Sequence, residues 1–143
     1  MNRFLIDKIK DDLITFRRQM HRFPECAFNE FKTTKNIISF LKQFPEIKVI
    51  PTQPTGVIAE YKGSEKSKTW IAFRADIDAL PIKENTGLSY QSNNGSMHAC
   101  GHDMHTTWLL ATIAMVHQYP VNKNIRFIFQ PAEEIGQGAL SMI

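Results

Sequence analysis

Three short polar clusters carry the kinds of side chain that bind divalent metal ions and use them in hydrolysis. Thiolate, imidazole and carboxylate ligands together suit zinc, or manganese and its neighbours such as cobalt and nickel, better than calcium or magnesium. If the clusters meet in space, they could hold one or two such ions. Their members are Asp76 and Asp78, then Cys100, His102, Asp103 and His105, and then Glu133 and Glu134.

The Cys100-Gly101-His102 segment places two potential ligands on one side of an extended chain. Gly101 would let the backbone fold tightly around an ion. A small buried cysteine beside a hydrogen-bonded loop histidine is the ordinary alternative, but His98, His102 and His105 within eight residues favour a metal site. A cysteine nucleophile with a histidine base is a third interpretation, and neighbouring side chains rarely reach that geometry.

Glu133 and Glu134 follow a proline at the end of an apolar segment. Adjacent carboxylates point in different directions, so one can bind a metal while the other accepts a proton from water. A solvated acidic pair is the alternative. We favour the functional interpretation because a buried strand would deliver this pair to its position.

Asp76 and Asp78 also follow an apolar segment, and they are two residues apart. One of them could orient a ligand histidine or stabilise the metal site by hydrogen bonding to the metal's ligands. The alternative is a turn aspartate bonded to its own backbone, and Arg74 could pair with either carboxylate. We assign Asp103 and His105 only a supporting role. We expect His21, which faces a helix end, to be structural or to complement the helix dipole.

Helices and strands must position these clusters. The spacing of Ile6, Ile9, Leu13, Phe16 and Met20 predicts a first helix that ends at Pro24. A second helix is expected after an Asn29 cap, with Phe31, Ile38 and Leu41 buried, and it should stop before Pro45. A third helix, Thr106 to Tyr119, is apolar nearly all round and therefore expected to be central. Residues Ala139 to Ile143 resemble the first turn of another helix.

Four strands are expected, and the polar segment 63–68 predicts a hairpin between the second and third. The third is almost wholly apolar, as a strand covered on both faces would be. Alternating helices and strands predict an α/β fold, with a mixed sheet flanked by helices on both faces and the polar clusters at one rim. The strands are Ile47–Ile50, Gly56–Tyr61, Thr69–Phe73 and Asn124–Gln130.

Composition excludes several classes of protein. The 143 residues suffice for one domain, and 43% hydrophobic with 22% charged residues is typical of a globular chain. A net charge of +3 without a long basic run argues against a nucleic-acid partner. The longest apolar stretch, Trp108–Val116, is too short for a membrane span, and the first twelve residues do not resemble a signal peptide. Two cysteines form no disulfide framework, so we expect a cytoplasmic protein.

Three motifs, in this order and spacing, resemble the M20 metallopeptidase family. They are RADIDALP (74–81), MHACGHDMHT (97–106) and FQPAEE (129–134) followed by a glycine-containing turn. Within that family they are most similar to the amidohydrolase branch of hippurate hydrolases, N-acetyl-diaminopimelate deacetylases and auxin-conjugate hydrolases. The upstream segments RRQMHRFPE, FNEFKTT and TGVIAEYKG also fit, so the resemblance covers essentially the whole chain.

The resemblance implies a metal-dependent amidohydrolase that cleaves small N-acyl amino acids with a metal-activated water. It matches Cys100, His102 and Glu134 to metal ligands and Glu133 to the general base. Either Asp76 or Asp78 matches the active-site aspartate, and the choice stays open.

Family members are considerably longer, with later histidine ligands and an inserted lid domain. Residues 1–143 are therefore expected to be the N-terminal part of the catalytic domain, and a homodimer is expected only for the full-length form. The alternatives are a non-catalytic fragment of the same fold and a metallo-aminoacylase or dipeptidase with peptide substrates.

Overall fold

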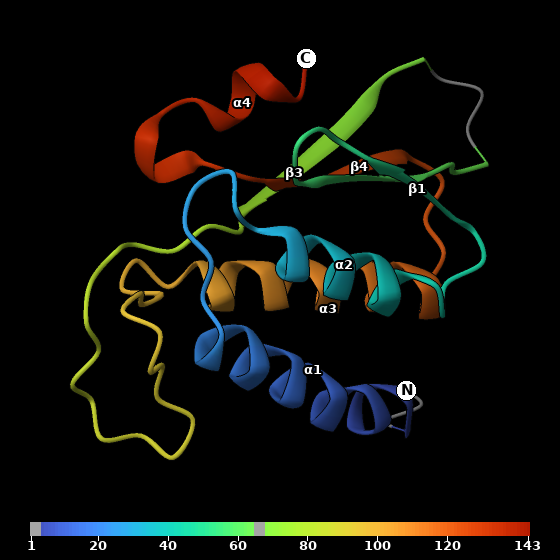
Figure 1. The fold of residues 1–143 in the computed structure, drawn as a ribbon. Helices are drawn as coiled ribbons and strands as arrows, with labels where there is room; N and C mark the ends of the chain where they lie inside the picture. The colour runs from blue at the N-terminus through green and yellow to red at the C-terminus, as the bar shows by residue number, and fades with distance from the viewer. Residues whose placement is uncertain (1–3, 65–67) are drawn as a thin grey trace.

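The computed structural model describes residues 4–64 and 68–143, which fold into a mixed sheet flanked by helices (Figure 1). Element order follows the sequence expectation of alternating helices and strands. The elements are α1 Phe4–Arg22, α2 Phe31–Leu41, β1 Ile47–Pro51, β2 Val57–Tyr61, β3 Trp70–Asp76, α3 His102–Gln118, β4 Asn124–Gln130, the 3-10 turn Glu133–Ile135 and α4 Gly138–Ser141.

The sheet has the strand order β1-β2-β4-β3. β2 pairs antiparallel with both β1 and β4, whereas β3 and β4 are parallel. Parallel neighbours need a crossover connection, and α3 lies in the segment that joins them. The parallel pair brings the carboxyl ends of β3 and β4 to the same rim.

The predicted hairpin between the second and third strands is wrong. β2 instead forms a hairpin with β1, and its other edge pairs with the later strand β4. β4 competes successfully for that edge because Phe127 and Phe129 are fully buried in the core opposite Ala59 and Val57. Residues 65–67 of the predicted turn lie outside the described residues.

The expectation that the third strand is covered on both faces is also wrong. Among the described residues β3 is an edge strand, so Ile71 and Phe73 remain 45% and 42% exposed. Burial begins only at its end, with Ala75 and Asp76. The strand therefore places its last residue, and not its apolar centre, in the interior.

Helices α1, α2 and α3 lie on one side of the sheet, and the short α4 lies on the other (Figure 1). α2 packs on β1 and β2, α3 packs on β3 and β4, and α1 packs against α3. Alternate residues of β2 and β4 face this layer, as the two-residue period of a strand requires. The buried cluster includes Val57, Ala59, Phe127, Phe129, Ile37, Leu110 and Ile113.

Helix α3 begins at His102 rather than at Thr106, because Gly101 adopts a left-handed φ of 80° and turns the chain into the helix. Its burial is one-sided, since Trp108 is 60% exposed while Leu110 and Ile113 are fully buried. The expectation of a helix buried all round is therefore wrong.

Helix α2 begins after Glu30, whose side chain is fully buried, and Asn29 bonds instead to the carbonyl of Ala27. Phe31 is 57% exposed, and the buried face consists of Thr33, Ile37 and Leu41. In α1 the buried positions Ile9, Phe16 and Met20 match the prediction, while the side chain of Ile6 lies outside the described residues. Within the described part of the chain, no helix is both long and apolar enough to cross a membrane.

Candidate metal centre

The three polar clusters meet at the rim formed by the carboxyl ends of β3 and β4. Asp76 is the last residue of β3 and lies in register with Gln130, the last residue of β4. Asp78 follows two residues later, and the Glu133–Glu134 pair follows β4. His102 enters as the first residue of α3. The convergence expected from the order of strands and clusters is therefore what the fold produces.

Asp78 is fully buried and organises this rim. One carboxylate oxygen accepts the backbone N–H of Glu134 at 3.0 Å, and the other lies 3.4 Å from Nδ1 of His102. Burial alone would raise the pKa of Asp78, but hydrogen bonding to His102 and to the backbone at Glu134 and Glu133 lowers it. Asp78 therefore contacts the imidazole of His102 and, at the same time, anchors the backbone of Glu134.

His102 has a defined orientation. Its Nδ1 lies 3.0 Å from the carbonyl oxygen of Asp78, which can only accept, so Nδ1 is a donor, and in the neutral form of the ring Nε2 carries the lone pair. Burial lowers the pKa of His102, yet bonding to Asp78 and the charges of Asp78 and Asp76 raise it to about 9. The excess negative charge around this ring is what a bound cation would balance.

Glu133 and Glu134 complete a three-residue group with His102, in which one ligand atom from each residue lies within 4.8 Å of the others. Oε2 of Glu133 is 3.8 Å from Nε2 of His102, and Oε1 of Glu134 is 3.9 Å from Nδ1. Among the described residues, Oε1 of Glu134 is buried without a hydrogen-bond partner. A buried oxygen without a partner, in a group with an imidazole and a second carboxylate, fits a divalent cation.

Cys100 lies at the exposed side of this group. Hydrogen bonding to Glu134, then burial and the charges of Glu134, Glu133 and Asp78, raises the pKa of its thiol. The sulfur is thus near the acidic residues, although Cys100 is not in either described group whose ligand atoms lie within 4.8 Å. A raised thiol pKa disfavours the cysteine nucleophile, since the thiolate is the reactive form.

A second three-residue group consists of Asp76, His102 and His105. Asp76 is also paired with Arg74, at 3.1 Å between Oδ1 and Nε. Because Nδ1 of His102 is engaged with Asp78, a single lone pair on Nε2 is available to the two groups. This imidazole can therefore bind one ion, held from one side or the other.

Comparison with known proteins places the chain in a family. The model of peptidase family M20/M25/M40 matches residues 72–143, which is half of the chain and includes every cluster described above. The chain belongs to this family. Its sequence is 46% identical over 136 residues to an N-acetyldiaminopimelate deacetylase of Bacillus velezensis and 48% identical over 135 residues to an N-acetylcysteine deacetylase of Bacillus subtilis.

The fold of this M20 chain also matches a solved structure. The Bacillus subtilis YXEP protein, a dinuclear metal-binding peptidase of the M20 family, has a TM-score of 0.87 and 45% identity over 94% of this chain. The match covers 39% of that structure. Likewise the two deacetylases are matched over 94% and 92% of this chain, which spans 36% and 35% of their own lengths.

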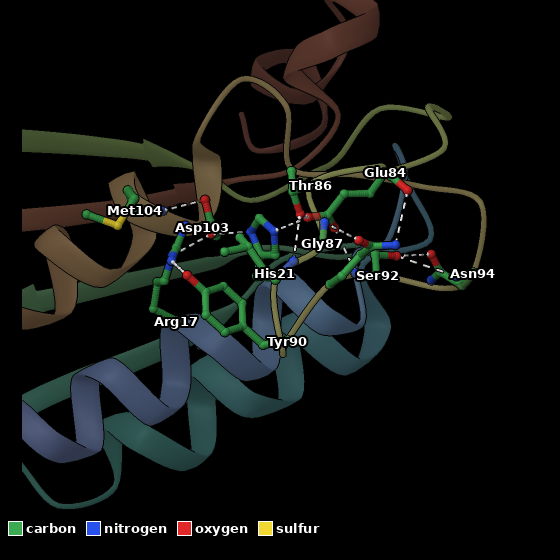
Figure 2. A network of polar contacts seen from close by, with 12 residues as sticks. Arg17, His21, Glu84, Thr86, Gly87, Tyr90, Ser92, Asn94, Asp103 and Met104 are labelled. Carbon is green, nitrogen blue, oxygen red and sulfur yellow. Dashed lines mark hydrogen bonds and ion pairs between the residues drawn. The ribbon is translucent and has the colours of Figure 1, made fainter.

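Behind the M20 site, a buried polar network fixes the start of α3 (Figure 2). Asp103, next to His102, lies 2.9 Å from Nδ1 of His21 and 2.7 Å from Nε of Arg17. The other ring nitrogen of His21 is 3.0 Å from Glu84. The network joins α1, the segment 84–94 and α3, so His21 has the structural position that its sequence context predicts.

Sequence reasoning missed Glu84 and also Glu30, another fully buried carboxyl. Both lie in segments without a metal-ligand motif, and their partners are distant in sequence. Glu84 meets His21 across 63 positions, and Glu30 meets the backbone of Ala132 across 102. No local pattern could have revealed contacts of this range.

Proposed function

We propose that this chain is the N-terminal part of the catalytic domain of a metal-dependent amidohydrolase, which cleaves small N-acyl amino acids into an amino acid and a carboxylate. The observation that carries the proposal is the group of His102, Glu133 and Glu134 at the rim, with its unpartnered buried oxygen. The names of the two deacetylases support the substrate class. Their greater length supports the assignment to one part of a larger domain.

In this proposal Cys100, His102 and Glu134 hold a divalent metal, zinc or manganese, and a second ion needs further donors. When bound, the metal supplies a Lewis acid that makes water a nucleophile near neutral pH and polarises the amide carbonyl. Glu133, whose side chain is 38% exposed, can accept the proton of the attacking water and pass it to the leaving amine. Asp78 orients His102 through Nδ1.

The acyl group is the finer part of the proposal. Acetyl is favoured because both named relatives are deacetylases, and a benzoyl group, as in hippurate, is the competing choice. A cytoplasmic location and a homodimeric full-length form stay predictions from the sequence.

The test uses the whole protein that carries this chain, loaded with zinc or manganese and assayed on N-acetyldiaminopimelate, N-acetylcysteine, hippurate and a dipeptide. Glu133→Gln should retain the metal and lose at least a hundredfold in kcat, as removal of a general base does. Cys100→Ser should lower metal content instead. Glu46→Gln, which changes a surface carboxylate paired with His117, is the matched control and should change neither.

Loss of metal together with activity in Glu133→Gln would refute the division of roles. A fully metallated wild-type protein that hydrolyses none of these substrates would refute the function. Cleavage of the dipeptide alone would replace the amidohydrolase with a dipeptidase.

A further inference from the structure

Glu30 is a buried acidic residue that lies outside the metal-binding motifs. Its side chain is fully buried, and both carboxyl oxygens accept hydrogen bonds. One oxygen accepts the hydroxyl of Thr55 at 2.7 Å, and the other accepts the backbone N–H of Ala132 at 2.9 Å. Glu30 therefore joins the start of α2 to the residue that immediately precedes Glu133.

Ala132 has a backbone conformation that needs support. It is fully buried and left-handed, with φ 49° and ψ 38°, although it is not glycine. This region is strained for a residue other than glycine, and such conformations persist where the surroundings determine them. The carbonyl of Ala132 also accepts the N–H groups of Gln137 and Gly138. The turn that carries Glu133 is thus shaped at Ala132.

A second buried carboxylate holds the other side of Glu133. Asp78 accepts the backbone N–H of Glu134 at 3.0 Å. The residues before and after Glu133 are therefore each anchored through their N–H to a fully buried acidic side chain. The backbone of Glu133 is fixed in this way, while its side chain remains partly open to solvent.

We propose that Glu30 is a positioning residue for Glu133, acting through its hydrogen bond to the N–H of Ala132. The inference rests on the proposed function, in which Glu133 is the general base. If the bond is lost, the turn relaxes and the carboxylate of Glu133 moves. A displacement of about 1 Å at a reacting group can cost about a hundredfold in rate. Glu134 keeps its bond to Asp78, so metal binding should change little.

The test compares Glu30→Met, which has similar size but accepts no hydrogen bond, with Glu30→Gln in the whole metal-loaded protein. Glu30→Met should lower kcat at least tenfold, with KM and metal content within twofold of wild type. Glu30→Gln should stay within threefold in kcat, because its amide oxygen can accept from Ala132 while its NH₂ faces the Thr55 oxygen. If Glu30→Met does not fold, Glu30→Asp, which shortens the reach by one methylene, replaces it.

Thr55→Val is the matched control, since it removes only the other bond of Glu30 and should lower stability without lowering kcat. Amide hydrogen exchange in the same proteins gives a readout independent of activity: exchange at Ala132 should quicken in Glu30→Met and not in Thr55→Val. An equal loss of kcat in Glu30→Met and Thr55→Val would overturn the proposal. An equal loss of kcat in Glu30→Gln and Glu30→Met would also overturn it. A wild type inactive on every substrate would refute the proposed function, while the exchange measurement would still test the Glu30–Ala132 bond.

Discussion

At the scale of single residues, Asp76 and Asp78 differ sharply although they are two positions apart. Asp78 is fully buried and touches both His102 and the backbone of Glu134. Asp76 ends a strand and pairs with Arg74, whose side chain is 52% exposed. Asp78 therefore has the contacts expected of the active-site aspartate, whereas Asp76, although it is also buried, is paired with Arg74.

We expect Asp78→Asn to weaken zinc binding about ten- to a hundredfold, because support of a ligand histidine is typically worth that much. Asp76→Asn should weaken zinc binding less than threefold. Competition with a chromogenic chelator measures both affinities. Equal losses of zinc affinity in Asp78→Asn and Asp76→Asn would show that the ion is held by the group of Asp76, His102 and His105.

At this scale, motifs predict which types of residue form the site, but they do not decide between two nearby residues of the same type. The spacing of the two aspartates and their position after an apolar segment were equally compatible with either residue as the active-site aspartate. What distinguishes them is the point at which β3 enters the interior, and this depends on the pairing with β4. Glu30 was unpredictable for a different reason, because its partner Ala132 is brought near only by the completed fold.

At the scale of elements, helix α2 provides a direct test of which face is buried. Ile37 is fully buried in the core, whereas Phe31 is largely exposed at the helix start. Ile37→Ala should lower the free energy of unfolding by about 2–5 kcal/mol, the usual cost of such a truncation in a core. Phe31→Ala should cost less than about 1 kcal/mol.

Urea unfolding followed by circular dichroism measures both variants of α2. A larger loss of unfolding free energy for Phe31→Ala than for Ile37→Ala would show that Phe31 lies on the buried face, as the sequence predicts. The prediction failed only at Phe31, since Leu41 is fully buried as predicted and Ile38 packs against the core. The chain between Pro24 and Phe31 is bonded locally, with Glu25 accepting the N–H groups of Lys32 and Thr33. These bonds set the rotation of the helix, and apolar spacing alone does not report them.

Strand existence was easier to predict than strand pairing. β4 matches the predicted segment Asn124–Gln130 exactly at both ends, and β1 and β2 differ from their predicted ranges by one residue. Pairing depends on which strands share the core face across long sequence separations, so neither the hairpin nor the exposure of β3 followed from local patterns.

At the scale of the whole molecule, the network in Figure 2 links the first helix to Asp103 at the start of α3, next to the candidate ligand His102, and should contribute to acid stability. Burial would raise the pKa of Glu84, but hydrogen bonds from Thr86, Ser92 and His21, with the charge of His21, lower it to about 2. The folded pKa lies below the ordinary 4.5, so the ionised group stabilises the fold above about pH 4.5. This contribution is lost as the pH falls from about 4.5 to about 2.

Glu84→Gln should therefore lower stability at pH 7 by about 1–2 kcal/mol, the scale of a weakened hydrogen bond to a charged group. The variant should also lose less stability than wild type between pH 4.5 and pH 2. Thermal unfolding across this range measures the difference, with Glu46→Gln as the surface control. If the stability of wild type and of Glu84→Gln changed with pH in parallel, the attribution of this acid sensitivity to Glu84 would be contradicted.

The exposed flank of β3 has a practical consequence for handling the polypeptide. Within the described residues β3 pairs with one strand, so the backbone N–H and C=O groups along its other edge are available for pairing. The exposed side chains of Ile71 and Phe73 add apolar surface beside that edge. Such a flank is a template for another molecule to extend the sheet. Preparations of this polypeptide should therefore self-associate as they are concentrated, and dilute samples will report its intrinsic metal affinity most faithfully.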